Sequence, residues 1–365
     1  MQEQSNKLNF SGENIYVGID VHLKSWTVTI LTENNHHKTF NQPPQSETLA
    51  AYLQLHFPGA NYHSAYEAGF SGLWAHYQLV SLGVRNIVIN ASDVPTTGKE
   101  RLHKTDSVDS KKIAYALRAQ ELTSIYIPTQ LTMEDRSLVR IRSAVVKDLS
   151  RLKHQVKMML YFYGVKIPAL FKNESRFSRN FIQWLKEEAS LTIGINKEAF
   201  LFLINELEAK KQSLLAITRA VRQLSKEERY CKNMELIRSI PGIGLITGIT
   251  FLVEIEDIYR FNNTDKFAGF IGIIPSCHSS GEKENKGEMT PRGQSHLKVA
   301  LIESSWFAAR MDPALSLAFN KYCRRMESNK AIIRIARKLA NRIYFVLTKQ
   351  IKYACGMALN TGMCN

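Results

Sequence analysis

Four acidic side chains in the first part of the 365-residue chain have the types and spacing that chemistry on phosphates requires. Asp20 and Glu67 each end a stretch rich in β-branched or aromatic residues, and Asp106 and Asp109 lie three residues apart in a segment with helical periodicity. Residues three apart share one face of a helix. Carboxylates gathered in one place cannot all remain ionised without a cation, and their oxygens select Mg²⁺ or Mn²⁺. A pair of such ions suits phosphoryl transfer.

Each acid taken alone has a simpler interpretation. Asp20 also suits a turn, and Asp106 also suits the N-cap of the helix that follows it. The metal hypothesis therefore rests on the ordered set of four acids and on the elements that must bring them together.

Those elements are expected to form an α/β fold with one mixed sheet covered on both faces. Strands are predicted at 15–20, 26–31, 38–41, 62–67 and 85–90, and helices at 46–57, 73–82 and 106–120. If the fourth strand lies beside the first, Asp20 and Glu67 become neighbours at the strand ends. The last helix then places Asp106 and Asp109 over them. This order of elements matches an RNase H-like (RuvC-like) nuclease fold.

The middle of the chain, about 131–232, is expected to form long, charged, amphipathic helices. Apolar residues recur there at steps of three and four, first along 138–152 and again along 201–224. This pattern predicts a helical hairpin or a coiled-coil spacer, an element that often dimerises. The connecting stretch 164–190 has no regular pattern.

The last part, about 233–365, is expected to form a compact and mostly α-helical domain. The sequence IPGIG at 240–244 breaks one helix and starts another. A glycine-rich segment at 279–293 follows, and a basic helix is predicted at about 329–348.

The composition favours a polyanionic partner. Lys and Arg outnumber Asp and Glu by 48 to 33, which gives a net charge of +15. Such an excess neutralises phosphates and releases their counterions, so nucleic acid is the expected ligand. A hydrophobic content of 44% excludes wholesale disorder.

The cysteines and the N-terminus indicate a cytoplasmic protein. The five cysteines are scattered and lack the spacing of a zinc or redox motif, so reduced thiols are expected. The first residues are polar, and no uncharged stretch reaches the length that spans a bilayer.

Several short motifs carry a family resemblance. VGID at 17–20, YEAG at 66–69 and KTDSVD at 104–109 resemble the N-terminal DEDD domain of insertion-sequence family 110 transposases, a prokaryotic group that includes pilin-gene invertases and RNA-guided bridge recombinases. IPGIG, then FAGFIGIIP at 267–275, SSG at 279–281 and RGQSHLK at 292–298 match the C-terminal hallmark of that family in the same order. The run AGFSG at 68–72 and Gln294 depart from the common pattern, and both leave the acids intact.

The resemblance implies roles for individual residues. It makes Asp20, Glu67, Asp106 and Asp109 the metal ligands and Ser280 the nucleophile. A serine that attacks a DNA phosphate conserves the bond energy in a phosphoserine link, so rejoining needs no ATP. Ser279 is the alternative nucleophile, and Ser-Ser-Gly is also an ordinary loop tripeptide.

His278, next to this pair of serines, is left open as a proton acceptor, a DNA contact or a surface residue.

Two further features are candidates for binding phosphate. Gly242 and Gly244 resemble a helix-hairpin-helix turn that exposes backbone N–H groups, although a plain helix-capping turn explains the spacing nearly as well. The basic side chains of the last helix fall mostly opposite its apolar face, which is better explained by a phosphate backbone than by solvation alone or by a membrane surface. The nucleic-acid-binding residues expected in all are Lys104, Gly242, Gly244, Arg292, Lys298, Lys330, Arg334, Arg337, Lys338 and Arg342.

The leading hypothesis is a transposase or site-specific recombinase with three parts. These are an RNase H-like DEDD domain at 1–130, a helical coiled-coil spacer at 131–232 and a serine transposase domain at 233–365. The resemblance implies Mg²⁺ (or Mn²⁺), donor and target DNA, a structured non-coding bridge RNA as guide, and dimers or tetramers in which the acids of one subunit serve the serine of another. Two alternatives remain: a junction-resolving metal nuclease without a covalent intermediate, and an inactive nucleic-acid-binding scaffold.

Overall fold

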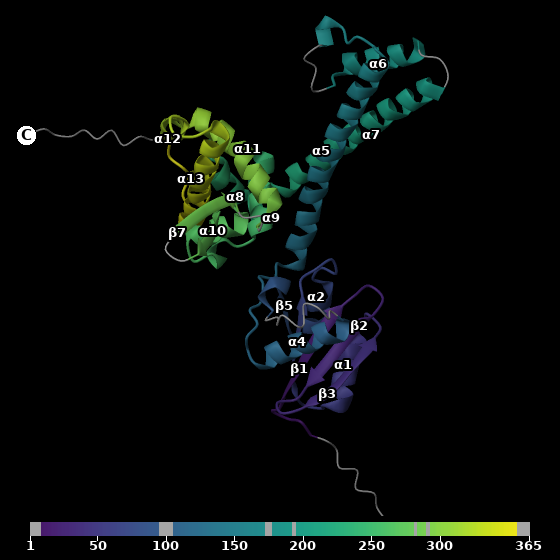
Figure 1. Cartoon of the computed structure of the whole chain (residues 1–365), viewed down its shortest axis with the longest axis vertical. Coiled ribbons are helices and arrows are strands. Elements are labelled where there is room, and N and C mark those ends of the chain that lie inside the picture. The colour runs from purple at the N-terminus through teal and green to yellow at the C-terminus, as the bar shows by residue number, and fades with distance from the viewer. Residues whose placement is uncertain are drawn as a thin grey trace, which may run out of the picture. The chain divides into compact units, whose positions relative to one another are not determined.

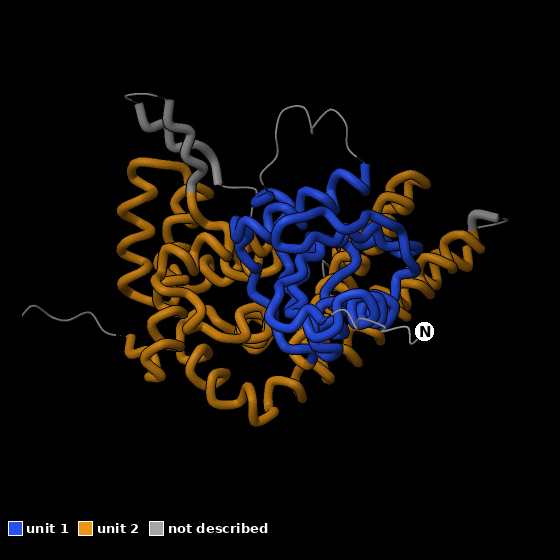
Figure 2. The backbone as a smooth tube through the Cα atoms, turned by 90° about the horizontal axis from the view of Figure 1, so that it is seen from below, with its two compact units in different colours: residues 1–130 blue, residues 131–365 orange. Residues whose placement is uncertain are grey.

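The structure is a computed structural model of the chain, drawn in Figure 1. It describes residues 9–94, 105–171, 177–191, 195–280, 283–289 and 293–355, and for 195–196, 275–280 and 283–289 it describes the backbone alone. The chain divides into two compact units, Met1–Gln130 and Leu131–Asn365, which Figure 2 shows in different colours.

A five-stranded mixed sheet forms the centre of the first unit. Its strands are β1 (Asn14–Val21), β2 (Trp26–Leu31), β3 (His36–Gln42), β4 (Asn61–Glu67) and β5 (Arg85–Ile89), in the order β3-β2-β1-β4-β5. β1 pairs with β2 and β2 with β3 in antiparallel fashion, whereas β1 with β4 and β4 with β5 are parallel. The predicted RNase H-like sheet, with the fourth strand beside the first, is confirmed.

Helices cover both faces of this sheet, and the alternation of strand residues decides which face each side chain meets. The odd-numbered residues of β1 from Ile15 to Val21 join one core with side chains of α1 (Ser46–His56) and α2 (Trp74–Ser81). The even-numbered residues of β1 therefore face the other side. There α4 (Asp106–Arg118) packs over β1, β2 and β4.

Gly18 on β1 permits α4 to lie unusually close to the sheet. A Cβ atom at Gly18 would meet the carbonyl oxygen of Ser110 at 2.0 Å and the nitrogen of Ala114 at 2.5 Å. The helix is also tied laterally, because the Ser110 hydroxyl lies 2.9 Å from the Thr29 hydroxyl of β2 in a buried hydrogen bond. The first turn of α4 is thereby held over the end of β1.

The second unit is largely helical, as predicted. It contains α5 (Gln130–Phe162, which starts at the last residue of the first unit), η2 (Ala169–Phe171), α6 (Arg179–Leu191), α7 (Ile195–Leu224), α8 (Glu228–Arg238), α9 (Leu245–Ile255), η3 (Ile258–Arg260), α10 (Thr264–Ile271), β6 (Pro275–Ser280), β7 (Lys283–Met289), α11 (Ser295–Met311), α12 (Pro313–Cys323) and α13 (Ser328–Lys349). A single short 3-10 helix, η1 (Ala91–Asp93), completes the elements of the first unit that the structure describes.

The two longest helices of this unit run alongside each other in opposite directions. The Arg142 side chain of α5 donates to the Thr218 hydroxyl of α7 at 3.1 Å, and the Lys210 ammonium of α7 lies 3.5 Å from Asp148 of α5. Residue numbers rise along one helix as they fall along the other, so the pair is an antiparallel hairpin. Buried residues of α5, α6 and α7 form one core. A larger core is built by α8 to α13 together with Val139 of α5 and with Val221 and Leu224 of α7.

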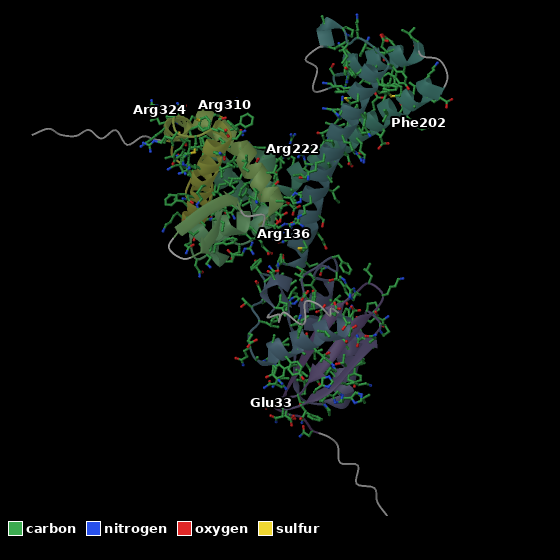
Figure 3. All side chains as sticks on the ribbon, in the orientation of Figure 1. Glu33, Arg136, Phe202, Arg222, Arg310 and Arg324 are labelled. Atoms are coloured by element: carbon green, nitrogen blue, oxygen red, sulfur yellow. The ribbon has the colours of Figure 1, made fainter. Side chains whose placement is uncertain are left out.

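Buried charges fix the first half of α5 to α9. Glu254 is fully buried and accepts two hydrogen bonds of 2.7 Å from Arg140. Arg136 of α5, labelled in Figure 3, donates to the carbonyl oxygens of Val253 and Glu254 at 2.7 and 3.0 Å. These bonds satisfy carbonyl groups near the C-terminal end of α9 that the helix itself leaves without partners.

The stretch at 164–190 and the glycine-rich segment at 279–293 are more regular than the sequence analysis expected. α6 begins at Arg179 and packs Phe181 and Leu185 into the core of the helical hairpin. β6 and β7 pair as an antiparallel hairpin that begins at Pro275 and continues into the glycine-rich segment. Among the helices in the described ranges, none is both long enough and apolar enough to cross a membrane.

Candidate active site

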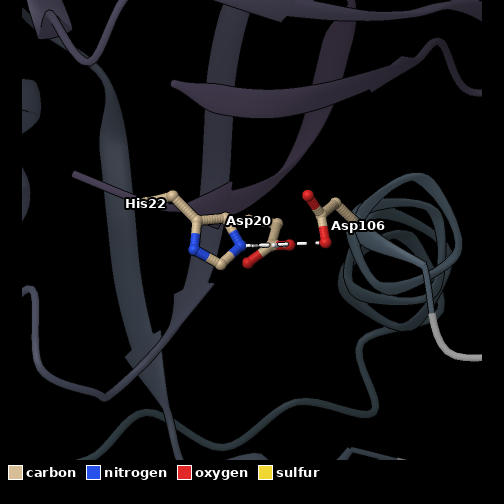
Figure 4. A group of neighbouring side chains, drawn as sticks. All are labelled: Asp20, His22 and Asp106. Carbon is tan, nitrogen blue, oxygen red and sulfur yellow. Dashed lines mark hydrogen bonds and ion pairs between the residues drawn. The ribbon is translucent and has the colours of Figure 1, made fainter. Parts of the chain in front are cut away.

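The end of β1 and the first turn of α4 bring two of the predicted acids together. Asp20 has an even number on β1 and therefore lies on the face that α4 covers. Asp106 is the first residue of α4, and Thr105 rather than Asp106 takes the N-cap position. One ligand atom each from Asp20, Asp106 and His22 lies within 4.8 Å of the other two. Figure 4 shows the three side chains turned toward one another. The arrangement can hold a divalent cation.

The electrostatics of Asp20 favour a cation at this place. Burial raises the pKa of the Asp20 carboxyl above its usual range, and the negative charges of Asp106 and Asp109 raise it further. The neighbouring His22 acts in the opposite direction and does not cancel these effects. A bound cation would offset the cost of keeping these carboxylates ionised together.

Asp109 lies one helical turn after Asp106, with a side chain that is 18% exposed. Its carboxylate is 3.7 Å from the Lys112 ammonium on the same helix. Because its charge acts on the pKa of Asp20, Asp109 belongs to the same electrostatic group.

Glu67 ends β4 beside the end of β1. The parallel register pairs Gly18 with Ala65 and Ile19 with Tyr66, so the next positions along the two strands are Asp20 and Glu67. Tyr66 belongs to the core on the α1 and α2 face, and alternation therefore turns Glu67 toward the α4 face with Asp20. All four predicted acids thus belong to one edge of the sheet and the helix above it.

His22 is a site residue that the sequence analysis missed. Its Nε2 atom lies 3.2 Å from Asp20 Oδ2 and 3.8 Å from Asp106 Oδ1. The signal that could have found it is the spacing of two residues after Asp20, since residues i and i+2 of a strand point to the same face.

Ser280 is the last residue of β6, and its backbone pairs with Lys283 across the hairpin. Ser279 pairs with Glu284, and His278 with Asn285. The side chains of these residues lie outside the described part of the structure, so their roles stay predictions. The acids belong to the first unit and the serines to the second.

A backbone contact joins the residues that flank the β6–β7 hairpin. Gly293 has a φ of +116°, and a Cβ atom there would meet the Cα atom of Gly272 at 2.5 Å. The Gln294 N–H also donates to the Phe270 carbonyl at 2.9 Å. The FAGFIGIIP motif, which begins in α10, and the RGQSHLK motif, which continues into α11, therefore meet at the base of the hairpin that carries Ser280.

The two glycines of the IPGIG turn lie in different surroundings. Gly242 has a φ of +91°, and a Cβ atom there would meet the Ser304 carbonyl oxygen of α11 at 2.6 Å. This close approach gives Gly242 a packing role. Gly244 is the N-cap of α9, and a Cβ atom there would meet no atom within 4 Å. Gly244 is the more accessible of the pair for a phosphate contact.

Two arginines of α13 are engaged with carboxylates inside the second unit. Arg342 forms an ion pair with Asp312, whose side chain is 1% exposed and also accepts a hydrogen bond of 2.7 Å from Tyr353. Arg337 forms an ion pair with Asp265. The buried Asp312 gives Arg342 a structural role, whereas Asp265 is 83% exposed, so its ion pair with Arg337 contributes little to stability.

The remaining basic candidates of the second unit differ in exposure. Lys330, Arg334 and Lys338 are exposed on α13, and Lys298 is partly buried on α11. Lys104 and Arg292 lie outside the described residues. The exposed set on α13 is the part of the predicted phosphate-binding surface that the structure leaves open to a ligand.

Comparisons with known proteins agree with this arrangement. A family model of DEDD transposases of IS110 matches residues 17–164, and a second model, described as "Transposase IS116/IS110/IS902 family", matches residues 234–320. The first match contains the four acids. The second contains Ser280, the IPGIG turn at 240–244 and the glycine-rich segment at 279–293.

Individual relatives cover most of the chain. A putative transposase of Sinorhizobium fredii, y4qE, is 26% identical over 278 residues, which are 76% of this chain and 66% of the relative. The transposase for insertion sequence element IS1111A of Coxiella burnetii is 26% identical over 258 residues, 70% of this chain and 69% of the relative. A second putative transposase of Sinorhizobium fredii, y4rJ, is 22% identical over 359 residues and covers 89% of each chain.

Proposed function

The chain belongs to the IS110 family of transposases, and on that premise we propose that it cuts and rejoins DNA with Ser280 as nucleophile and with Mg²⁺ bound by its four acids. The observation that carries the proposal is the meeting of Asp20 and Asp106 at one edge of the sheet, with Glu67 and Asp109 on the same side. Oxygen ligands from strand ends and a helix suit Mg²⁺ or Mn²⁺.

In the proposed reaction the Ser280 hydroxyl attacks a phosphorus atom of the DNA backbone. A bond forms between the serine oxygen and phosphorus, and the bond from phosphorus to one deoxyribose oxygen breaks. That oxygen leaves with a proton as a free DNA hydroxyl, and the serine proton is lost in exchange. Rejoining reverses these steps with a different DNA end, and a bound divalent ion would stabilise the charge that develops on the phosphate oxygens.

The partners of the proposed reaction are DNA, a structured guide RNA and further copies of the chain. The net charge of +15 and the exposed cations of α13 support a nucleic-acid partner. The guide RNA and a dimer or tetramer follow from the family resemblance. A cytoplasmic location is part of the same proposal.

The test uses full-length protein, any RNA that co-purifies with it and a plasmid pair that carries the ends and the target of its element. Wild-type protein should join the two plasmids with Mg²⁺ present, and should leave a covalent protein–DNA adduct after rapid denaturation. Ser280→Ala should remove adduct and product, whereas Ser279→Ala should keep both.

Two results would contradict the serine mechanism. DNA cutting by Ser280→Ala without an adduct would indicate a metal nuclease in which water attacks. Recombination by Asp20→Asn at the wild-type rate would show that the Asp20 carboxylate, and the metal site proposed around it, are not needed for the reaction.

A further inference from the structure

His22 occupies a fixed position beside two of the proposed metal ligands. β1 ends at Val21, and the His22 N–H donates to the Ser25 carbonyl at 3.2 Å across the turn into β2. This bond fixes the backbone of His22 two residues after Asp20, on the side that α4 covers. The Phe70 ring lies beside the imidazole, with the ring centroids 6.2 Å apart.

We propose that Nε2 of His22 is a direct ligand of the divalent ion that Asp20 and Asp106 hold. This inference rests on the proposed function, because it adds a nitrogen donor to the same metal site. It departs from a site made of carboxylates alone.

The spacing of the three donor atoms fits one ion. A first-row divalent ion holds its ligands at about 2.1 Å, so neighbouring ligands lie about 3 Å apart and opposite ones about 4.2 Å apart. His22 Nε2 lies 3.2 Å from the Asp20 oxygen and 3.8 Å from the Asp106 oxygen. Both separations fall in the range that ligands of a common ion adopt.

The exposure of the residues also suits a ligand. The side chains of Asp20 and His22 are 22% and 45% exposed, and that of Asp106 is 65% exposed. Water and a phosphate group can therefore reach the remaining positions around an ion. A histidine that served only to orient Asp20 would keep its hydrogen bond to Asp20 and leave the ion with oxygen ligands alone.

A nitrogen ligand changes which metals bind best. Imidazole nitrogen is bound best by Fe²⁺ and the later divalent transition metals, whereas Mg²⁺ and Mn²⁺ are usually held by oxygen ligands. Of these two ions Mn²⁺, as a transition metal, accepts a nitrogen ligand more readily. We therefore expect the site to bind Mn²⁺ more tightly than Mg²⁺, and His22 to supply part of that difference.

The experiment measures Mn²⁺ bound to the full-length protein by electron paramagnetic resonance. The titration gives the affinity, Mg²⁺ competition gives the affinity for Mg²⁺, and electron spin echo modulation detects a ¹⁴N nucleus bonded to the ion. His22→Ala and His22→Gln should remove the ¹⁴N modulation and weaken Mn²⁺ binding by about tenfold or more, with a smaller effect on Mg²⁺. His36→Ala, which removes an exposed imidazole from the same unit, should change neither quantity.

Asp20→Asn distinguishes a failure of the His22 proposal from a failure of the proposed metal site itself. Wild-type protein that binds Mn²⁺ without ¹⁴N modulation, or a His22→Ala variant that retains the modulation, overturns the role of His22 and leaves the acidic site intact. Mn²⁺ binding that is absent from the wild type, or unchanged in Asp20→Asn, overturns the acidic site and the role of His22 together.

Discussion

At the scale of single residues, Asp20 combines a partly buried position with neighbours of its own charge. The folded protein raises the pKa of the Asp20 carboxyl through burial and through Asp106 and Asp109. At pH values above that raised pKa, the ionised carboxylate therefore destabilises the folded state. Functional sites often retain such costs because activity depends on them.

Asp20→Asn should therefore separate activity from stability. We expect strand cleavage to fall by at least about a hundredfold, because the proposed function makes Asp20 a metal ligand. The midpoint of thermal unfolding in the presence of a chelator should stay the same or rise, because a repelled charge is removed. A large fall in the unfolding temperature would contradict this account.

Arg342 and Lys338 form a second residue-scale comparison on α13. Arg342→Ala leaves the buried Asp312 carboxylate without its ion pair, so the free energy of unfolding should fall by about 3 kcal/mol. Lys338→Ala removes an exposed cation, so stability should hardly change.

In DNA binding the order of the two effects should be reversed: Lys338→Ala should weaken binding, and Arg342→Ala should leave it nearly unchanged. If Lys338 contacts a phosphate, its removal lowers the slope of log affinity against log salt concentration by about one. Urea unfolding and a salt series of DNA-binding measurements give both quantities. A stable Arg342→Ala protein with a reduced salt slope would place Arg342 on the DNA instead.

The acids of the site were predictable from the sequence, whereas His22 is indicated there only by its spacing of two residues after Asp20. Asp20 and Glu67 end recognisable strands, and Asp106 and Asp109 share a helix face, so their types and positions suffice. The relevance of His22 depends on which face of β1 meets α4. That choice is made by contacts such as Gly18 to Ser110, between residues far apart in the chain.

At the scale of elements, the packing of α4 on the sheet determines where two of the four acids lie. A methyl group at Gly18 would sit 2.0 Å from the Ser110 carbonyl oxygen, so Gly18→Ala should force α4 away from β1. We expect a loss of about 3 kcal/mol in unfolding free energy and a fall in cleavage, because Asp106 and Asp109 move with the helix.

Gly69→Ala is the matched control for that substitution. A Cβ atom at Gly69 would meet no atom within 4 Å, and the residue belongs to the same unit. Its effect on stability should stay within about 0.5 kcal/mol. Equal destabilisation by both variants, measured in urea, would rule out the close approach at Gly18 as the cause.

Helix α6 shows why some elements escaped prediction. Gly164, with a φ of +69°, follows the end of α5, and Pro168 comes soon after it. These residues predict irregular structure for the stretch up to residue 190. Phe181, Ile182 and Leu185 nevertheless repeat with helical spacing and are buried, because α5 and α7 provide a surface for them. That surface comes from distant parts of the chain and is not visible locally.

At the scale of the whole molecule, the two compact units contain separate hydrophobic cores. The cores of the first unit draw on the sheet and its helices, and those of the second unit draw on α5 to α13. Units with separate cores can unfold in separate transitions instead of one cooperative transition.

Scanning calorimetry should therefore resolve at least two unfolding transitions. Gly18→Ala should lower the temperature of one of them, and Arg342→Ala should lower a different one. A single transition that both variants shift equally would indicate that the units unfold together. The proposed division of the second unit at residue 232 predicts a further, weaker transition for the helical hairpin.

The contact between Gly272 and Gly293 has an evolutionary consequence. Because the two residues touch, the segment between them begins and ends at almost the same point. A segment with adjoining ends can be replaced by one of different length or sequence without distorting the helices that support it. We expect chimaeras that exchange 275–289 for the matching segment of a relative to fold, so that a family could diversify this hairpin while its scaffold stays unchanged.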